Sequence, residues 1–167
     1  MNSGLDSSDC SSIEATQVPQ VTQEERAEEI EQAFELFDNW EDRYQVLIDL
    51  GKKLPPMDPS EKNDTSRVSG CQSNVWMVAH VKDTVAGPIV EFSADSDASI
   101  TKGLVAILWY VFSGQPAEKI LSFDIDEFLD RLGLMSHLSM NRRNGLFSMV
   151  LRVKALAASR SRGAQEV

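Results

Sequence analysis

The feature that most constrains the fold of this chain is a change in the period of its apolar residues. In the segments on either side of residues 75–93, apolar side chains recur every three to four positions, as on one face of a helix. Within that block the run Val75 to Val81 is apolar and β-branched, and the run Ile89 to Ser93 alternates. Gly87-Pro88 lies between the two runs, as at a turn. The pattern predicts an antiparallel hairpin with helices before and after it.

The fold class follows from the grouping of these elements. Helices come first, then strands, then helices again, without an alternation of single strands and single helices. This order predicts an α+β fold in which a small antiparallel β-sheet of about three strands is packed with several helices. Residues Ser66 to Gly70 are assigned to the third strand.

The helix ends are predicted from capping residues. The Thr22 hydroxyl can cap a first helix, and Glu25 can bond back to it. Asn39 can cap a second helix, which Gly51 is expected to end in a left-handed conformation. Asp97 is expected to cap the helix after the hairpin or to contact a partner, and these two roles are compatible. Later ends are predicted at Gly114 and Gly133, with a short helix after Pro116 and a long final helix from about Asn141.

Four aromatic side chains of the first two helices are spaced as core residues, namely Phe34, Phe37, Trp40 and Tyr44. His80 falls in an apolar strand and is expected to be a hydrogen-bonded core residue. His137 is expected to form hydrogen bonds in a loop. We therefore assign neither histidine a catalytic role.

The chain of 167 residues is long enough for one domain with a single core. Residues 1–21 are rich in Ser, Asp and Thr and poor in large apolar side chains, which predicts a flexible tail. We assign residues 22–160 to the domain and residues 161–167 to a disordered C-terminus.

The distribution of charge excludes some classes of function. The formal net charge is −10, and residues 1–59 contain 14 acidic side chains against 4 basic ones. Because an acidic surface repels phosphate, nucleic acid is not an expected partner. No apolar run is long enough to cross a bilayer, and the N-terminus has neither a secretory nor a transit-peptide pattern. We therefore expect no membrane association, and the cytoplasm as the location.

Two cysteines are present, Cys10 in the predicted tail and Cys71 between a polar loop and the first strand. With two histidines at these spacings, they predict neither a disulfide scaffold nor a metal site. Cys71 can be a small buried apolar residue. However, Gly70 permits a close approach by another chain, and Gln72 and Ser73 can hydrogen-bond a thiolate or a persulfide. Cys10 either has no role or acts as a resolving thiol for Cys71.

A set of short motifs is distributed over about residues 34–157. They are Asn39-Trp40-Glu41 with Tyr44, Gly51, Leu54-Pro55, Gly70-Cys71-Gln72-Ser73 with Val75-Trp76, Asp95-Ser96-Asp97-Ala98 with Ile100, Lys102-Gly103-Leu104, His137-Leu138, Arg142, and Gly145-Leu146. In order and spacing this set resembles the SufE/CsdE family of sulfur acceptors. The chain departs from the family pattern at Met140, where proline is usual, and at Arg143, which adds a charge.

The resemblance implies a SufE/IscU-like fold and a role in iron–sulfur cluster assembly. Cys71 is then the residue that accepts sulfane sulfur as a persulfide from a cysteine desulfurase of the SufS/CsdA type, stimulates that enzyme and delivers the sulfur to an iron–sulfur scaffold. The desulfurase uses pyridoxal phosphate, whereas this chain is expected to need no cofactor of its own and to be a monomer or a homodimer. The implied partner contacts are Gln72, Ser73, Asp97 and Arg142, and the implied supports of the cysteine loop are Gly70 and Trp76.

The residues alone leave two other functions open. A cysteine hydrolase or thiol peroxidase would use Cys71 as nucleophile and His80 or His137 as base. A non-catalytic adaptor would bind a desulfurase without receiving sulfur, and Cys71 would then be structural. Arg142 can likewise contact an acidic patch of a partner or pair with a local carboxylate.

Overall fold

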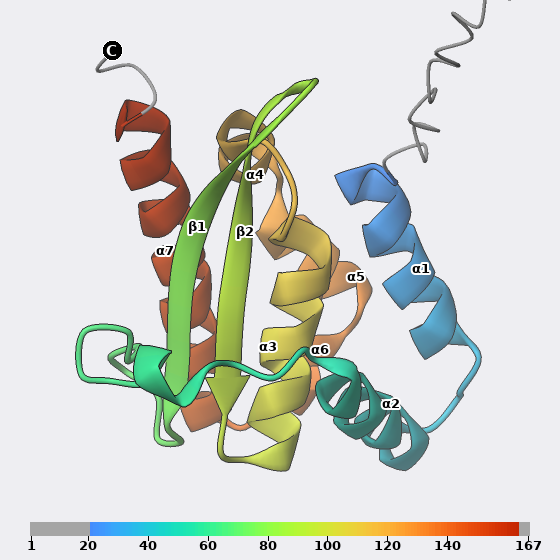
Figure 1. The fold of residues 1–167 in the computed structure, drawn as a ribbon. Coiled ribbons are helices and arrows are strands. Elements are labelled where there is room, and N and C mark those ends of the chain that lie inside the picture. Colours follow the sequence, from blue (N-terminus) through green and yellow to red (C-terminus); the bar gives the residue numbers. More distant parts are fainter. Residues whose placement is uncertain (1–20, 164–167) are drawn as a thin grey trace, which may run out of the picture.

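The computed structural model describes residues 21–163 as an α+β fold, which confirms the predicted fold class (Figure 1). A β-hairpin lies between two groups of helices in the chain order. The elements are α1 (Gln23–Glu35), α2 (Trp40–Lys53), the 3-10 turn η1 (Pro59–Glu61), β1 (Val75–Thr84), β2 (Gly87–Ser96), α3 (Ser99–Phe112), α4 (Ala117–Ser122), α5 (Ile125–Arg131), α6 (Leu134–His137) and α7 (Met140–Gly163).

The sheet in this part of the chain has two strands, so the prediction of about three was wrong. β1 and β2 pair antiparallel from Val75↔Ser96 to Thr84↔Gly87. The segment expected to form a third strand makes one bridge to β1, at Arg67↔Trp76. It ends there because Gly70 has φ +90°, a left-handed conformation that turns the chain away from the sheet.

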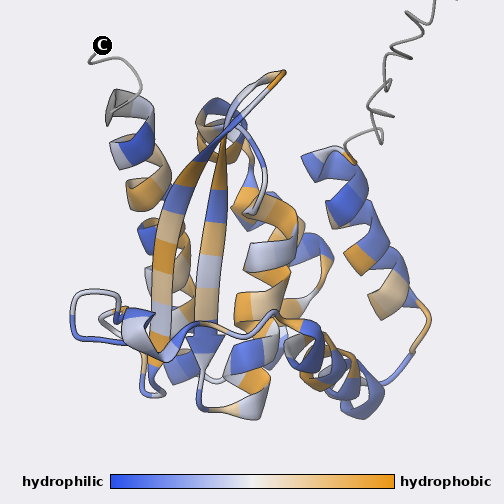
Figure 2. Cartoon of the chain, viewed as in Figure 1, coloured by the Kyte–Doolittle hydropathy of each residue, from blue (hydrophilic) through white to orange (hydrophobic). Residues whose placement is uncertain are grey.

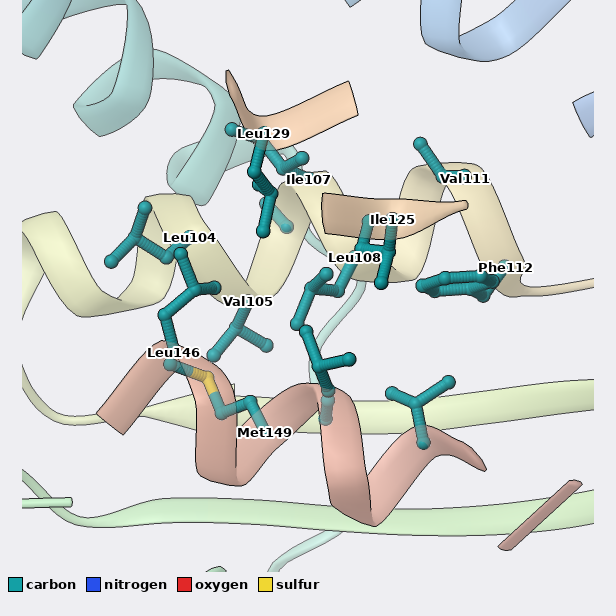
Figure 3. Packing of buried hydrophobic residues seen from close by; sticks show 14 of the residues in the cluster. Leu104, Val105, Ile107, Leu108, Val111, Phe112, Ile125, Leu129, Leu146 and Met149 are labelled. Carbon is teal, nitrogen blue, oxygen red and sulfur yellow. The ribbon is translucent and has the colours of Figure 1, made fainter. Parts of the chain in front are cut away.

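The core lies behind the hairpin, where β1 contacts α7 and β2 contacts α3. α3 is mostly hydrophobic along its length, whereas α1 is mostly hydrophilic (Figure 2). Leu146 and Met149 of α7 lie opposite Leu104 and Val105 of α3 (Figure 3). All four side chains are almost fully buried, so the two helices meet through dry apolar packing.

The capping signals at the starts of α1 and α2 are confirmed. Thr22 and Glu25 form a reciprocal capping box at the start of α1. The Asn39 side chain accepts a hydrogen bond from the backbone N of Asp42 at the start of α2. The expected termination of α5 at Gly133 also agrees with the structure, since Gly133 has φ +71° and precedes the one-turn helix α6.

Gly51 does not end α2, contrary to the prediction, because the helix continues to Lys53. Gly51 instead lies where α2 crosses α3, and a Cβ there would be 3.0 Å from the backbone N of Gly103. On the other side of the crossing, a Cβ on Gly103 would be 2.2 Å from the carbonyl O of Leu47. The two glycines therefore allow the backbones of α2 and α3 to touch.

Two further side-chain predictions need correction. His80 is on the exposed side of β1 and hydrogen-bonds the Glu61 carboxylate at 2.9 Å, so it is not a core residue. Phe37 is 37% exposed because α1 ends before it, while Phe34 is buried and Trp40 and Tyr44 pack half-buried against the core.

The predictions for the N-terminal tail, including the role of Cys10, fall on residues 1–20, outside the described residues. α7 continues to Gly163, past residue 160, where the sequence prediction put the end of the domain. Among the helices between residues 21 and 163, none is long and apolar enough to cross a membrane.

Candidate functional site

Cys71 lies in a short loop that connects a bridge to the first strand. The base of this loop is closed by a hydrogen bond of 2.8 Å from the backbone N of Val68 to the carbonyl O of Val75. The Cys71 thiol points to α7 and donates to the carbonyl O of Gly145 at 3.5 Å. A Cβ on Gly145 would be 3.4 Å from Sγ, which is an ordinary contact distance. The cysteine thus packs against the backbone of α7 at Gly145.

Gly70 holds the loop close to α7 by its conformation and by its lack of a side chain. Its φ of +90° is one that L side chains rarely adopt. A Cβ at this position would also be 2.5 Å from Oγ of Ser148 on α7. Gly70 and Cys71 are therefore fitted closely to the same helix, an arrangement consistent with the predicted supporting role of Gly70.

The surroundings of Cys71 favour the neutral thiol. The residue is half-buried, and burial raises the pKa of its thiol above the ordinary value. A thiol, unlike a thiolate, is a weak nucleophile. Sulfur chemistry at Cys71 therefore requires the loop to move, or a partner to supply a positive charge or a base.

Cys71 lines a cavity of about 450 Å³ between the loop, the start of α3 and the start of α7. Gln72, Ser73 and Arg142 line the same cavity, so the structure brings these three predicted partner contacts together with Cys71. Arg142 is its only charged lining residue and forms none of the ion pairs found between residues 21 and 163. The remaining lining residues are Ala98, Ser99, Ile100, Thr101, Leu104, Ser139, Asn141, Gly145 and Met149.

Asp97 is outside this cavity and does not cap α3, so that part of the prediction was wrong. The cap position of α3 is Ala98, which has no side chain able to bond the helix. The Asp97 carboxylate instead accepts from the backbone N of Asn74 at 3.1 Å and from its Nδ2 at 2.8 Å. Asp97 therefore ties the C-terminal end of the cysteine loop to the start of α3.

Trp76 is half-buried on the outward side of β1, one residue beyond the loop. The Lys62 ammonium lies 5.4 Å from the centroid of the Trp76 ring. It forms an ion pair with the Asp95 carboxylate at 2.5 Å, and Lys102 forms an ion pair with the same carboxylate at 3.2 Å. Burial opposes ionisation of Asp95, but hydrogen bonds from Lys62, Ser96 and Lys102 outweigh it and lower the pKa of the carboxyl. This cluster holds the segment before the loop against the hairpin.

Neither histidine lines the cysteine cavity. His80 pairs with Glu61, while the His137 ring lies 3.8 Å from the Trp40 ring centroid in a stacked arrangement. Nδ1 of His137 is 3.1 Å from the carbonyl O of Gly133, which agrees with the predicted hydrogen bonding, but the residue ends the one-turn helix α6 and is not in a loop as expected. Within residues 21–163, no three His, Cys, Asp or Glu side chains gather as a metal site would require.

Comparison with known proteins decides the family. The model of the SufE family, described as an Fe-S metabolism associated domain, matches residues 28–157, a range that includes the cysteine loop and the start of α7. The chain belongs to the SufE family. An uncharacterized SufE-like protein of Rhizobium etli is 43% identical to it over 128 residues, which are 77% of this chain and 86% of the relative. A second uncharacterized SufE-like protein, from Rhizobium meliloti, is 42% identical over 127 residues, 76% of this chain and 91% of the relative.

A solved structure shares the fold. The solution structure of a hypothetical protein from Thermus thermophilus superposes with a TM-score of 0.64 at 24% identity, over 80% of this chain and 94% of that one. This likeness shows that the overall fold of the chain is one already observed in solution.

Sequence reasoning missed several residues of the SufE site. Gly145 was recognised only as part of a motif, yet its carbonyl O accepts the hydrogen bond from Cys71. Nothing local in the sequence indicates that a backbone carbonyl inside a helix receives this contact. Asn141, Ser139 and Met149 had no local signal either, because only the fold brings the start of α7 to the loop.

Proposed function

We propose that this SufE protein accepts a sulfane sulfur onto Cys71 from a pyridoxal-phosphate-dependent cysteine desulfurase of the SufS/CsdA type, and that it delivers the sulfur to an iron–sulfur scaffold. One observation supports this most: Cys71 lines a cavity whose other lining residues offer hydrogen-bond donors and the Arg142 cation, but no carboxylate and no imidazole. Such a lining suits an anionic persulfide, which needs neutralisation and hydrogen bonds rather than a base.

The proposed transfer is a thiol exchange that needs no external oxidant. The Cys71 thiolate attacks the outer sulfur of the desulfurase persulfide, and a new bond forms between the two sulfur atoms. The bond between the inner and outer sulfur of the donor breaks, and the desulfurase cysteine leaves as a thiolate. The outer sulfur keeps its oxidation state throughout. Removal of this sulfur regenerates the desulfurase, which accounts for the expected stimulation.

Arg142 is suited to stabilise the product of this step. Arg142 lines the cavity and has no carboxylate partner among the ion pairs of the described residues, so its charge is available to a persulfide or to an acidic surface of the donor. Gln72 and Ser73 adjoin Cys71, and the Ser73 hydroxyl lies 3.3 Å from that of Thr101. We infer that these side chains, with Asp97 at the end of the loop, contact the desulfurase.

The rival functions have less support. A hydrolase or peroxidase that uses Cys71 requires a base near the thiol, and both histidines interact with groups outside the cavity. An adaptor without sulfur acceptance does not need a cation such as Arg142 beside a thiol that rests on a helical glycine. We further propose that the protein acts in the cytoplasm, as a monomer or homodimer, without a cofactor of its own.

The deciding experiment measures the intact mass of the full chain after incubation with a cysteine desulfurase and free cysteine. We expect one added sulfur atom, which a reductant removes and which is absent from a Cys71→Ser variant. Cys10→Ser is the matched control and should gain the sulfur as the wild type does. If the wild type gains no sulfur while the desulfurase is active, the adaptor function replaces the one proposed.

A further inference from the structure

The outer face of α7 is apolar, although it faces away from the core. Met140, Phe147 and Leu151 are 67%, 42% and 69% exposed. The spacings of seven and four residues place these three side chains on one line along the helix. The buried residues of α7, such as Met149 and Val153, lie on the opposite side. Because large apolar side chains line both sides, the helix has one more apolar face than its packing inside the domain requires.

Charge on α7 differs in sign from charge on the whole chain. Between residues 140 and 163 there is no acidic residue, and the basic residues are Arg142, Arg143, Arg152, Lys154, Arg160 and Arg162. The helical positions of Arg143 and Lys154 put them along one flank of the exposed line. Of the basic side chains of α7 up to residue 160, none takes part in the ion pairs of the described residues. In a chain with a net charge of −10, this is a local positive surface.

The exposed line adjoins the cysteine loop. A Cβ on Gly70 would be 2.5 Å from Oγ of Ser148, and Ser148 is a neighbour of Leu151 on the helix surface because it lies three residues before it. A partner that covers the loop therefore reaches Leu151, and Phe147 one turn before it, with little further extension.

We propose that Met140, Phe147 and Leu151, flanked by Arg143 and Lys154, form a docking face for the sulfur donor, here called the α7 stripe. The donor surface that fits it is apolar at its centre and acidic at its rim. This inference rests on the proposed function and adds to it the second point of contact that orients the donor over Cys71.

Charge and position favour the sulfur donor as the partner that covers the α7 stripe. The acidic rim is required because the stripe is flanked by cations that have no acidic partner on their own helix. A centre of three large apolar side chains can supply most of the binding free energy, since a few buried anchors dominate most interfaces. Val85 at the tip of the hairpin is also fully exposed, but it stands alone and lies at the other end of β1 from the loop.

The test compares three variants of the full chain. Phe147→Ser/Leu151→Ser removes two apolar anchors, Arg143→Glu/Lys154→Glu reverses the flanking charge, and Val85→Ser is the matched control for loss of an exposed apolar residue. Circular dichroism and thermal unfolding verify folding, and loading of Cys71 by inorganic polysulfide verifies that the thiol itself is intact. Binding to a cysteine desulfurase is then measured by surface plasmon resonance at low and high salt.

We expect the apolar variant to raise the Kd for the desulfurase by about tenfold or more, mainly through faster dissociation. The charge variant should slow association and lose much of the salt dependence. Val85→Ser should bind as the wild type does. An unchanged Kd in the apolar variant would overturn the proposal. It would also be overturned if Phe147 and Leu151 instead were required for self-association in light scattering, or for binding to anionic phospholipid vesicles.

The outcome separates this inference from the proposed function. If the wild type accepts sulfur at Cys71 and the apolar variant accepts it equally fast at limiting concentration, only the docking face is wrong. If the wild type accepts no sulfur from the desulfurase, the proposed function itself fails.

Discussion

Asn74 and Asp97 are joined by three hydrogen bonds. The Asp97 carboxylate accepts from the backbone N of Asn74 at 3.1 Å and from its Nδ2 at 2.8 Å, and the backbone N of Asp97 donates to the carbonyl O of Asn74 at 3.3 Å. Asn74 is the last residue before β1, and Asp97 follows β2 directly. The contact therefore fixes the C-terminal end of the cysteine loop to the residue that follows β2, at the open end of the hairpin.

Loss of the Asp97 carboxylate should make Cys71 more reactive. Asp97→Ala removes two hydrogen bonds that involve a charged group, and each contributes about 1 kcal/mol at an exposed position. We expect the rate of alkylation of Cys71 by iodoacetamide to rise about five- to tenfold, measured by mass spectrometry of the peptide that contains it. Asp83→Ala, an exposed carboxylate on the same hairpin, is the control. Equal rates in the two variants would show that Asp97 does not restrain the loop.

The pH dependence of alkylation should reflect the burial of Cys71. Since burial raises the pKa of the thiol, the thiolate forms at higher pH in the native state than in the unfolded chain. We expect the midpoint of the rate profile to lie above that of the same chain in denaturant. The native state should also lose stability as the pH rises through the unfolded pKa, because the unfolded thiol then ionises more readily. Coincident midpoints would indicate a solvated thiol.

Asp95 should stabilise the fold only while it is ionised. Replacement by Asn leaves Lys62 and Lys102 without their shared carboxylate, and we expect a loss of about 2 kcal/mol in the free energy of unfolding near neutral pH. The folded-state pKa is lowered, so this contribution is present above the unfolded pKa of about 4 and is lost as the pH falls through the folded pKa. Urea denaturation at several pH values measures the difference. The difference in the free energy of unfolding between the wild type and Asp95→Asn should become smaller below about pH 4. A difference that does not change with pH would contradict an electrostatic origin.

Two glycine substitutions should have opposite effects on stability. A Cβ on Gly103 would lie 2.2 Å from the Leu47 carbonyl O, so Gly103→Ala must separate α2 from α3, and we expect a loss of about 3 kcal/mol. On Gly145 the nearest contact would be 3.4 Å, an ordinary distance, and Ala favours a helix over Gly by about 1 kcal/mol. Gly145→Ala should therefore be neutral or stabilising. Chemical denaturation measures the free energy of unfolding of both variants. A similar loss of stability in Gly103→Ala and Gly145→Ala would contradict this account of the helix crossing.

The fold was predictable from the sequence wherever the signal is local. The Thr22–Glu25 capping box and the Asn39 cap involve residues three apart, and both were predicted correctly. Gly51 was misassigned because the reason for its presence lies on another helix, at Gly103. The extent of the sheet failed for a similar reason, since whether Ser66 to Gly70 forms a strand depends on pairing with β1 rather than on composition.

The candidate site divides in the same way. Cys71, Gln72 and Ser73 are adjacent in sequence and share one cavity. Arg142 joins them from the start of α7, far away in the sequence, and only the resemblance to the family pointed to it. Asp97 was predicted to be a functional or capping residue, but the hydrogen-bond partner of its carboxylate was not predictable. A residue before a helix can bond either to that helix or to the end of a neighbouring strand.

The closed base of the cysteine loop sets a limit on how far sulfur can travel. The hydrogen bond between Val68 and Val75 leaves six residues free, and Cys71 is the third of them. Three extended residues span about 10 Å, so while that bond persists the thiol stays within this radius of Val68. The loop is thus a short tether rather than a swinging arm. In the proposed sulfur transfer, both the donor and the acceptor of sulfur must therefore bring their own reacting groups to the surface of this domain, and the two cannot be served at the same time.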